Sequence, residues 1–119
     1  MKICIPTIKD EGIDSVAYGH FNSAPKFIMY DLATKELYCI ANENRFATKG
    51  NPTTIDLLFE HSVNALVVGG LCHKAFENLH KMNIKVYRST DFFHVYEIID
   101  QFSKDLMFEL HPQDCYDAD

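Results

Sequence analysis

Features that would place this chain in a membrane or outside the cell are missing. Its 119 residues contain no apolar run close to the roughly 18 residues that a membrane-spanning helix needs. The opening stretch, residues 1–6, is too short for a secretory signal. We therefore expect a cytoplasmic protein that makes no contact with a membrane.

A basic stripe is also missing. The chain carries 11 lysine and arginine residues against 17 aspartate and glutamate residues, which gives a formal net charge of −6. Proteins that bind nucleic acids gain most of their affinity by neutralising phosphates with basic side chains. We therefore expect no nucleic-acid partner for this chain.

Cysteine is scarce and follows no known pattern. Four cysteines stand at wide, irregular spacings, with no C-x-x-C pair of the kind that binds zinc or supports thioredoxin-like chemistry. Cys4 and Cys39 fall inside apolar strand patterns, which indicates core positions and reduced thiols. The chain also lacks a G-x-G-x-x-G fingerprint, a P-loop, a G-x-S-x-G elbow and an H-E-x-x-H pair. It therefore matches none of these nucleotide-binding, hydrolase or zinc-protease signatures.

Hydrophobic residues, by contrast, make up 47% of the chain and fall into short runs. Residues 2–6 and 65–68 are apolar on both faces, which predicts buried central strands. Residues 26–31 and 36–41 are β-rich runs with a short connector, which predicts a hairpin. Residues 84–87 alternate between apolar and polar side chains, as an edge strand does.

Three segments show the spacing of amphipathic helices, over residues 51–61, 72–82 and 90–102. The first starts at Asn51-Pro52, where asparagine can cap the helix and proline suits its first turn. The third starts at Thr90-Asp91, a pair that can also cap a helix.

The order of these elements, β-β-β-α-β-α-β-α, restricts the topology. Right-handed crossovers place the first, fourth and fifth strands side by side and parallel. The hairpin must then lie on the other side of the first strand, which gives the order 3-2-1-4-5 with the second strand antiparallel. We expect one α/β domain over residues 1–108, with helices packed on a mixed five-stranded sheet. An acidic, flexible tail without periodicity is expected over residues 109–119.

A binding site is expected beyond the carboxyl ends of the first and fourth strands, where the winding of the sheet reverses. The loop over residues 7–25 opens there, and loops of this length in a compact domain are usually functional or disordered. Its side chain best suited to chemistry is His20, a potential metal ligand. The alternative is that His20 holds the loop in place through hydrogen bonds.

A second segment opens at the same edge. Gly69-Gly70 follows the fourth strand and leads into a helix N-terminus, where free N–H groups and the helix dipole favour an anion. Cys72 stands in the first turn of this helix and could bind a soft metal as a thiolate. The alternative is a core position, because Cys72 also begins the apolar stripe of the helix.

In their order and spacing, these segments resemble the dinitrogenase iron–molybdenum cofactor biosynthesis family over roughly residues 1–105. The central piece looks like the family's S-x-H-F-G-x-A-P loop. The residues that carry the resemblance are Ile5-Pro6, Asp14-Ser15, Gly19-His20-Phe21, Ala24-Pro25, Gly69-Gly70, Ala75 and residues 84–87.

The resemblance implies a ribonuclease H-like three-layer fold that binds an iron–sulfur or iron–molybdenum cluster without turning it over. Asn22 stands where the family usually has glycine, and asparagine tolerates the positive φ that a glycine there would allow. Cys72 stands where another glycine is common, which could add a thiolate to the family's histidine, His20. The cofactor contacts implied are Ser15, His20, Phe21, Asn22, Gly69 and Gly70, with His20 and Cys72 as metal ligands.

Two functional classes follow. The first is a non-catalytic carrier of a metal–sulfur cluster in cofactor assembly, for instance in nitrogen fixation, with a donor or recipient protein as its partner. The second is a metal-free sensor or adaptor domain, because one histidine and one cysteine are few ligands for a cluster in a monomer. A homodimer that shares ligands would supply more. A nuclease is disfavoured, since the predicted central strands carry none of the carboxylates that two magnesium ions need.

Overall fold

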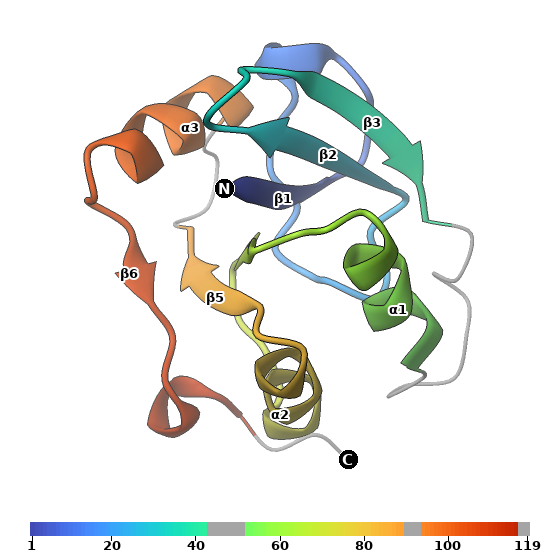
Figure 1. The fold of residues 1–119 in the computed structure, drawn as a ribbon, viewed down its shortest axis with the longest axis vertical. Coiled ribbons are helices and arrows are strands. Elements are labelled where there is room, and N and C mark those ends of the chain that lie inside the picture. Colours follow the sequence, from blue (N-terminus) through green and yellow to red (C-terminus); the bar gives the residue numbers. More distant parts are fainter. Residues whose placement is uncertain (43–51, 90–93, 117–119) are drawn as a thin grey trace.

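The computed structural model describes residues 1–42, 52–89 and 94–116 (Figure 1). Within these residues, one mixed sheet holds six strands in the order β3-β2-β1-β4-β5-β6. The predicted order of the first five strands is confirmed, and the predicted number is corrected from five to six. The strands are β1 (Lys2–Thr7), β2 (Lys26–Asp31), β3 (Leu37–Ala41), β4 (Ala65–Val68), β5 (Lys85–Arg88) and β6 (Phe108–Glu109).

The strand directions follow the predicted crossovers. β1 is antiparallel to β2 and parallel to β4, with Cys4 opposite Leu66. β4 is parallel to β5, with Leu66 opposite Val86. Because β1 and β4 are parallel neighbours, the loop after Thr7 and the Gly69-Gly70 segment leave the sheet at the same edge.

Helices cover both faces of the central strands, which explains why β4 and residues 3–6 of β1 are apolar. α1 (Pro52–Glu60) and α2 (His73–Lys81) pack on one face, and α3 (Val95–Ser103) packs on the other (Figure 1). Successive side chains of a strand point to opposite faces. Cys4 therefore lies in the core under α1 and α2, and Ile5 lies in the core under α3. The result is three layers, helix on sheet on helix.

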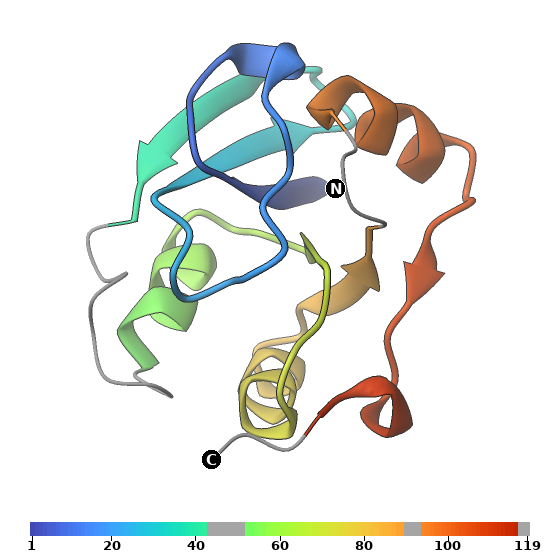
Figure 2. The same cartoon turned by 180° about the vertical axis from the view of Figure 1, so that it is seen from behind.

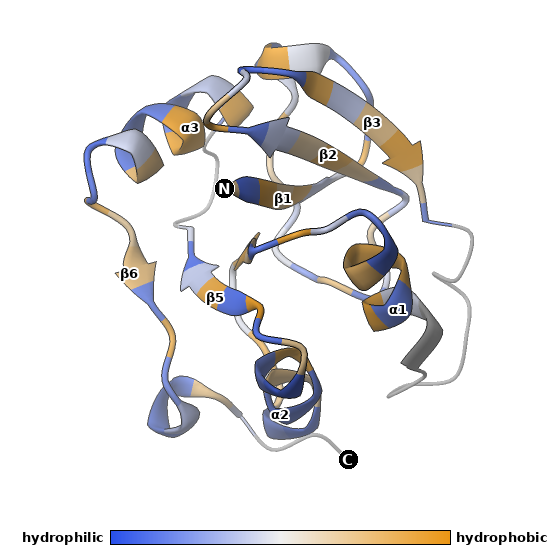
Figure 3. Ribbon diagram, viewed as in Figure 1, coloured by the Kyte–Doolittle hydropathy of each residue, from blue (hydrophilic) through white to orange (hydrophobic). Residues whose placement is uncertain are grey.

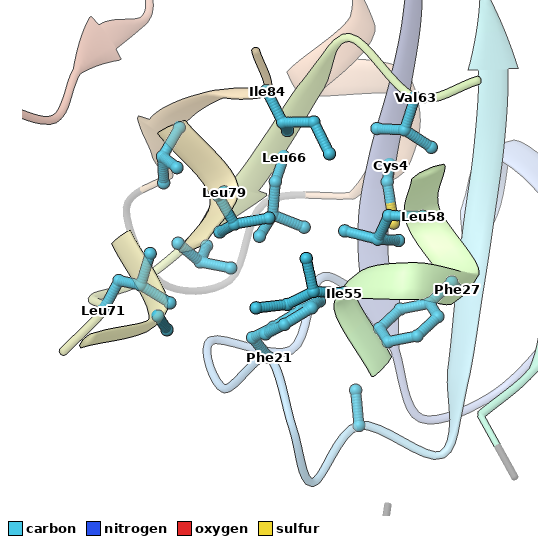
Figure 4. Close-up of a cluster of buried hydrophobic side chains, with 14 of the residues drawn as sticks. Cys4, Phe21, Phe27, Ile55, Leu58, Val63, Leu66, Leu71, Leu79 and Ile84 are labelled. Carbon is cyan, nitrogen blue, oxygen red and sulfur yellow. The ribbon is translucent and has the colours of Figure 1, made fainter. Parts of the chain in front are cut away.

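The larger core lies between the sheet and the helices α1 and α2 (Figure 4). Phe27, Leu58 and Leu79 bring fully buried side chains to it from β2, α1 and α2. Phe21, from the long loop, enters the same core and stacks on Phe27 with the ring centroids 5.7 Å apart. In Figure 3, β1 and β2 carry mostly hydrophobic colour, whereas α2 shows the mixed colour of an amphipathic cover. Phe21 thus anchors the long loop to the domain.

The helices are short, and their predicted starts are tested only in part. Asn51 and the Thr90-Asp91 pair lie outside the described residues. In the described chain, α3 begins at Val95 with His94 as its N-cap, and the His94 backbone N–H donates to the Glu97 carboxylate at 3.1 Å. Hydrogen bonds from the side chain and backbone of His94 hold the pKa of Glu97 below its usual value.

No helix within the described ranges has the length and apolarity to cross a membrane.

The segment after α3 differs from the flexible tail expected from the sequence. β6 pairs antiparallel with β5, and the Leu110 backbone N–H donates to the Val86 carbonyl at 2.8 Å. The Leu110 side chain is only 2% exposed. A 3-10 turn follows at Pro112–Asp114, and Tyr116 then pairs with the start of α2. A two-residue strand and one buried leucine produce no periodicity, which is why the sequence suggested a tail.

Candidate functional site

The first half of the long loop is shaped by its own polar groups. A 3-10 turn forms at Gly12–Asp14, where Gly12 adopts a φ of 61° that glycine allows without a steric penalty. Ser15 is fully buried, and its hydroxyl accepts a hydrogen bond from the Glu11 backbone N–H at 2.8 Å. Ser15 therefore fixes the bend of the loop.

Residues 16–18 then run beside the end of β1, and the loop passes the end of β4 before it returns to β2 (Figure 2). Ala17 pairs with Thr7, and the Tyr18 backbone N–H donates to the Pro6 carbonyl at 2.7 Å. On the other side, the loop is tied to the start of α3 through an isolated antiparallel bridge of Val16. The loop itself thus occupies the crevice where the sheet reverses, and His20 lies beyond it.

Gly19 and Gly69 let the loop approach the end of β4 closely. The Gly69 backbone N–H donates to the Gly19 carbonyl at 3.0 Å. A Cβ on Gly69 would lie 3.2 Å from Gly19 Cα and 3.4 Å from the Gly19 carbonyl oxygen, which is tighter than most real contacts of this kind. Gly69 therefore serves the contact between the loop and the strand end.

Two hollows open beside this contact. The Cys72 hollow has a volume of about 190 Å³, and the Gly69 hollow has a volume of about 260 Å³. The Cys72 hollow is lined by His20, Phe21, Asn22, Ser23, Gly70, Leu71, Cys72, Ala75 and Tyr116. The Gly69 hollow is lined by Gly19, His20, Gly69, Gly70 and Tyr116. Because His20, Gly70 and Tyr116 line both, they form the boundary between the two hollows.

His20 is exposed and is positioned by an aromatic contact. Its ring packs edge-on against Tyr18, with the ring centroids 5.5 Å apart. The Tyr18 hydroxyl lies 3.3 Å from the Ser23 hydroxyl, which steadies the tyrosine. Within the described chain, no residue hydrogen-bonds to the imidazole of His20. Both ring nitrogens are therefore available to an external group.

Cys72 is the N-cap of α2 and is half-buried. Its side chain lines the Cys72 hollow and also packs against the larger core. The backbone on either side of it is paired with Tyr116, whose N–H donates to the Leu71 carbonyl at 3.1 Å and whose carbonyl accepts from the His73 N–H at 3.0 Å. Cys72 therefore lines the hollow and also contacts the core, and its role as a metal ligand stays a prediction.

The turn at Asn22 is stabilised by the side chain of Asn42, which directly follows β3, and Asn22 does not use the left-handed backbone conformation. It does not adopt a positive φ, so the turn makes no use of the tolerance expected of asparagine. Its carbonyl instead accepts from the Asn42 side-chain amide at 3.1 Å, and the same amide donates to the Ala24 carbonyl at 2.9 Å. These bonds hold the loop at Asn22, which lines the Cys72 hollow.

All of the predicted site residues except Ser15 line one or both of the hollows. Phe21, Asn22 and Cys72 line the Cys72 hollow, Gly69 lines the Gly69 hollow, and His20 and Gly70 line both. Ser15 lines neither. Tyr116 lines both hollows, and sequence reasoning missed it because the stretch around it shows no periodicity.

Comparison with known families identifies the family of this chain. The model of the family described as dinitrogenase iron-molybdenum cofactor matches residues 1–105. The chain belongs to this family. The expected family resemblance is confirmed, and membership connects the chain with the biosynthesis or binding of a metal-containing cofactor. A search of curated proteins finds no match.

The fold of this chain is similar to the folds of solved structures, among them the following two. One is the apo form of the orange protein from Desulfovibrio gigas, with a TM-score of 0.84, 21% identity and coverage of 92% of each chain. The other is a putative NifB protein from Thermotoga that is assigned to the DUF35 family, with a TM-score of 0.79, 28% identity and 92% coverage of each chain. The likeness to the orange protein shows that the whole domain, and not only the loop motif, is shared.

The site offers few metal ligands of its own. Among the described residues, no group of three or more histidine, cysteine, aspartate or glutamate side chains could hold a metal ion. His20 and Cys72 are the two such donors on the Cys72 hollow. The volume of this hollow is about 190 Å³. The hollow suits a compact group that brings most of its own ligands.

Proposed function

We propose that this protein is a non-catalytic binding or carrier protein for an iron–sulfur or iron–molybdenum type cluster in cofactor assembly or delivery. The observation that carries the proposal is the position of exposed His20 and half-buried Cys72 on the wall of one hollow, at the N-terminus of α2. Imidazole and thiolate both suit iron, and thiolate suits the metals of sulfide clusters. A ribonuclease H-like classification of the three-layer fold is part of the same proposal.

The electrostatics of the hollows favour an anionic cluster even though the net charge of the protein is −6. α2 begins at the Cys72 hollow and carries no acidic residue in its first turn, so its dipole is not opposed there. Among the described residues that line the two hollows, none is an aspartate or a glutamate. A cluster with negative charge would therefore meet the positive end of the α2 dipole and no carboxylate of the described lining.

The small number of ligands favours a cargo over a permanently bound cofactor. With two donors available, a cluster would keep its sulfide ligands and exchange only one or two positions for His20 and Cys72. The exposure of His20 leaves that side of the cluster open to a donor or recipient protein. A second copy of the chain could add ligands from the same open side.

The site lacks the contacts that turnover needs, which supports binding as the function. An activated nucleophile requires a base within about 2.6–3.2 Å. Within the described chain, neither His20 nor the Cys72 thiol has such a partner. β1 and β4, the strands that lead to the site, carry no carboxylate. We therefore propose a cytoplasmic binding protein rather than an enzyme.

The proposal is tested by anaerobic reconstitution of the wild-type chain with iron(II), sulfide and molybdate, followed by anaerobic gel filtration. We expect metal and visible absorbance to elute with the protein, and the elution volume shows whether the loaded form is a monomer or a dimer. Bovine serum albumin treated in the same way controls for adventitious iron sulfide. Protein that elutes colourless and metal-free, both after reconstitution and when purified without air, contradicts the proposal.

A metal-free adaptor is the second candidate, and one observation favours it. The long loop exposes Ile8, Ile13 and Val16 by 55%, 52% and 46%, an apolar surface suited to contact with a protein. The same surface could serve a cluster carrier when it meets its recipient. The reconstitution separates the two candidates, because an adaptor takes up no metal.

Ser15→Ala tests whether Ser15 is a cofactor contact or a structural residue. We expect a loss of about 1 kcal/mol in the free energy of unfolding, because the Glu11 N–H loses its acceptor. Cluster retention should match the wild type, because Ser15 lines neither hollow. Urea unfolding and metal analysis after gel filtration measure the two effects. Unchanged stability together with weaker retention would show that Ser15 contacts the cluster.

A further inference from the structure

The C-terminal segment brings a residue to the site from beyond the part of the chain that matches the family. The family match ends at residue 105, whereas the packed structure continues to Tyr116. Leu110 fixes the middle of this segment through its buried side chain and its bond to β5. Two backbone hydrogen bonds, of 3.1 Å and 3.0 Å, then fix Tyr116 between Leu71 and His73 at the start of α2.

The fixed backbone places the Tyr116 side chain between the two hollows. Both the Cys72 hollow and the Gly69 hollow are lined by Tyr116, together with His20 and Gly70. The ring lies over Gly70, since a Cβ on Gly70 would be 3.6 Å from Tyr116 Cε1. Because Gly70 has no side chain, the aromatic ring is a main part of the partition.

The Tyr116 ring is held much less firmly than its backbone. The residue is 54% exposed. Within the described chain, its hydroxyl makes no hydrogen bond and its ring stacks on no other aromatic ring. A rotation about its side-chain bonds would therefore break no described polar contact, and it would join the two hollows into one larger space.

We propose that Tyr116 is a binding residue of this site and acts as its gate. The ring turns aside to admit a compact cluster across both hollows, and it then packs against the bound cluster and slows its release. The inference rests on the proposed function for the identity of the cargo. The gate itself rests on the geometry of the free protein, so the two can fail separately.

The first experiment measures release from the loaded protein. Wild type, Tyr116→Ala and Tyr116→Phe are reconstituted with iron(II), sulfide and molybdate, and the loss of visible absorbance is followed after adding an iron chelator. We expect release from Tyr116→Ala to be about tenfold faster, since changes at a binding surface act mostly on dissociation. Tyr116→Phe should release at the wild-type rate, because the ring and not the hydroxyl forms the gate. Equal rates for wild type and Tyr116→Ala would overturn the proposal.

The second experiment needs no cluster and measures access to the Cys72 thiol with a maleimide. Cys39 and Cys115 are replaced by serine, which leaves Cys72 and fully buried Cys4. Burial raises the pKa of the Cys4 thiol well above its usual value, which keeps that thiol protonated and unreactive. We expect Tyr116→Ala to increase the labelling rate of Cys72 about tenfold for a bulky maleimide.

Tyr96→Ala is the matched control, because Tyr96 is exposed to a similar extent, 46%, but lies on α3 on the other face of the sheet. It should change neither the labelling rate nor the release rate. A labelling rate in Tyr116→Ala equal to that of Tyr96→Ala overturns the gate even if the wild type binds a cluster. Faster labelling in a protein that takes up no metal would keep the gate and reject the proposed cargo.

Discussion

Replacing His20 with alanine is expected to reduce cluster retention by about tenfold or more, the scale of losing a metal ligand or its support. The imidazole is exposed, lines both hollows and has no hydrogen-bond partner within the described chain. Its contact with Tyr18 is a single edge-on ring packing, so little of the fold depends on it. We expect the free energy of unfolding to change by less than about 0.5 kcal/mol, as at an ordinary surface position.

The measurement compares metal content and absorbance after anaerobic gel filtration, together with urea unfolding of the free protein. His80→Ala is the matched control, because His80 is an exposed histidine near the other end of α2 that lines neither hollow. Cys72→Ser gives the comparison within the site, since it keeps the size of the side chain and removes the soft thiolate. If only one of the two donors is a ligand, only its variant loses retention.

Retention equal to the wild type in His20→Ala would reject His20 as a ligand. A large loss of stability in the same variant would instead support the structural interpretation, in which His20 holds the loop. Full retention by Cys72→Ser, with the fold intact, would assign Cys72 to the core alone. Each result therefore distinguishes a metal ligand from a residue that only lines the Cys72 hollow.

The arrangement of β1 to β5 could be predicted because strands that are buried on both faces appear in the sequence as continuous apolar runs. β4 and residues 3–6 of β1 are apolar without interruption, since α1 and α2 cover one side and α3 covers the other. The handedness of the crossovers then leaves one arrangement for the three parallel strands. β6 could not be predicted, because a two-residue strand is too short to produce an alternating pattern.

The candidate site was predictable where a reactive side chain stands within a segment that the sequence already places at the edge of the sheet. His20 and Cys72 were expected at one edge of the sheet, and they line the same hollow. Ser15 and Tyr116 show the limit of this reasoning. A buried serine that accepts one backbone hydrogen bond cannot be distinguished by sequence from a ligand-contacting one. Tyr116 reaches the site only because the distant pairing of β6 with β5 carries the segment there.

Gly69→Ala is expected to have the largest effect on the stability of the fold, and it should also disturb the site. The added methyl group would lie 3.2 Å from Gly19 Cα and 3.4 Å from the Gly19 carbonyl oxygen. Both atoms belong to the backbone of the long loop, so a rotamer change cannot relieve the contact. Gly69 does not adopt a positive φ, so backbone strain adds nothing and the effect is purely steric. The loop must move away, which weakens the 3.0 Å hydrogen bond from Gly69 to Gly19.

We expect Gly69→Ala to lower the free energy of unfolding by about 1–3 kcal/mol, the usual cost of forcing an extra methyl group into a packed contact. Cluster retention should fall with it, because His20 follows Gly19 directly and would move with the loop. Gly70→Ala is the matched control, since its methyl group would meet only the Tyr116 ring at 3.6 Å, an ordinary contact with a side chain that can turn. Its stability should stay within about 0.5 kcal/mol of the wild type. Urea unfolding and metal analysis of both variants measure the difference, and equal stabilities for the two would show that the loop does not depend on the close approach of Gly19 to Gly69.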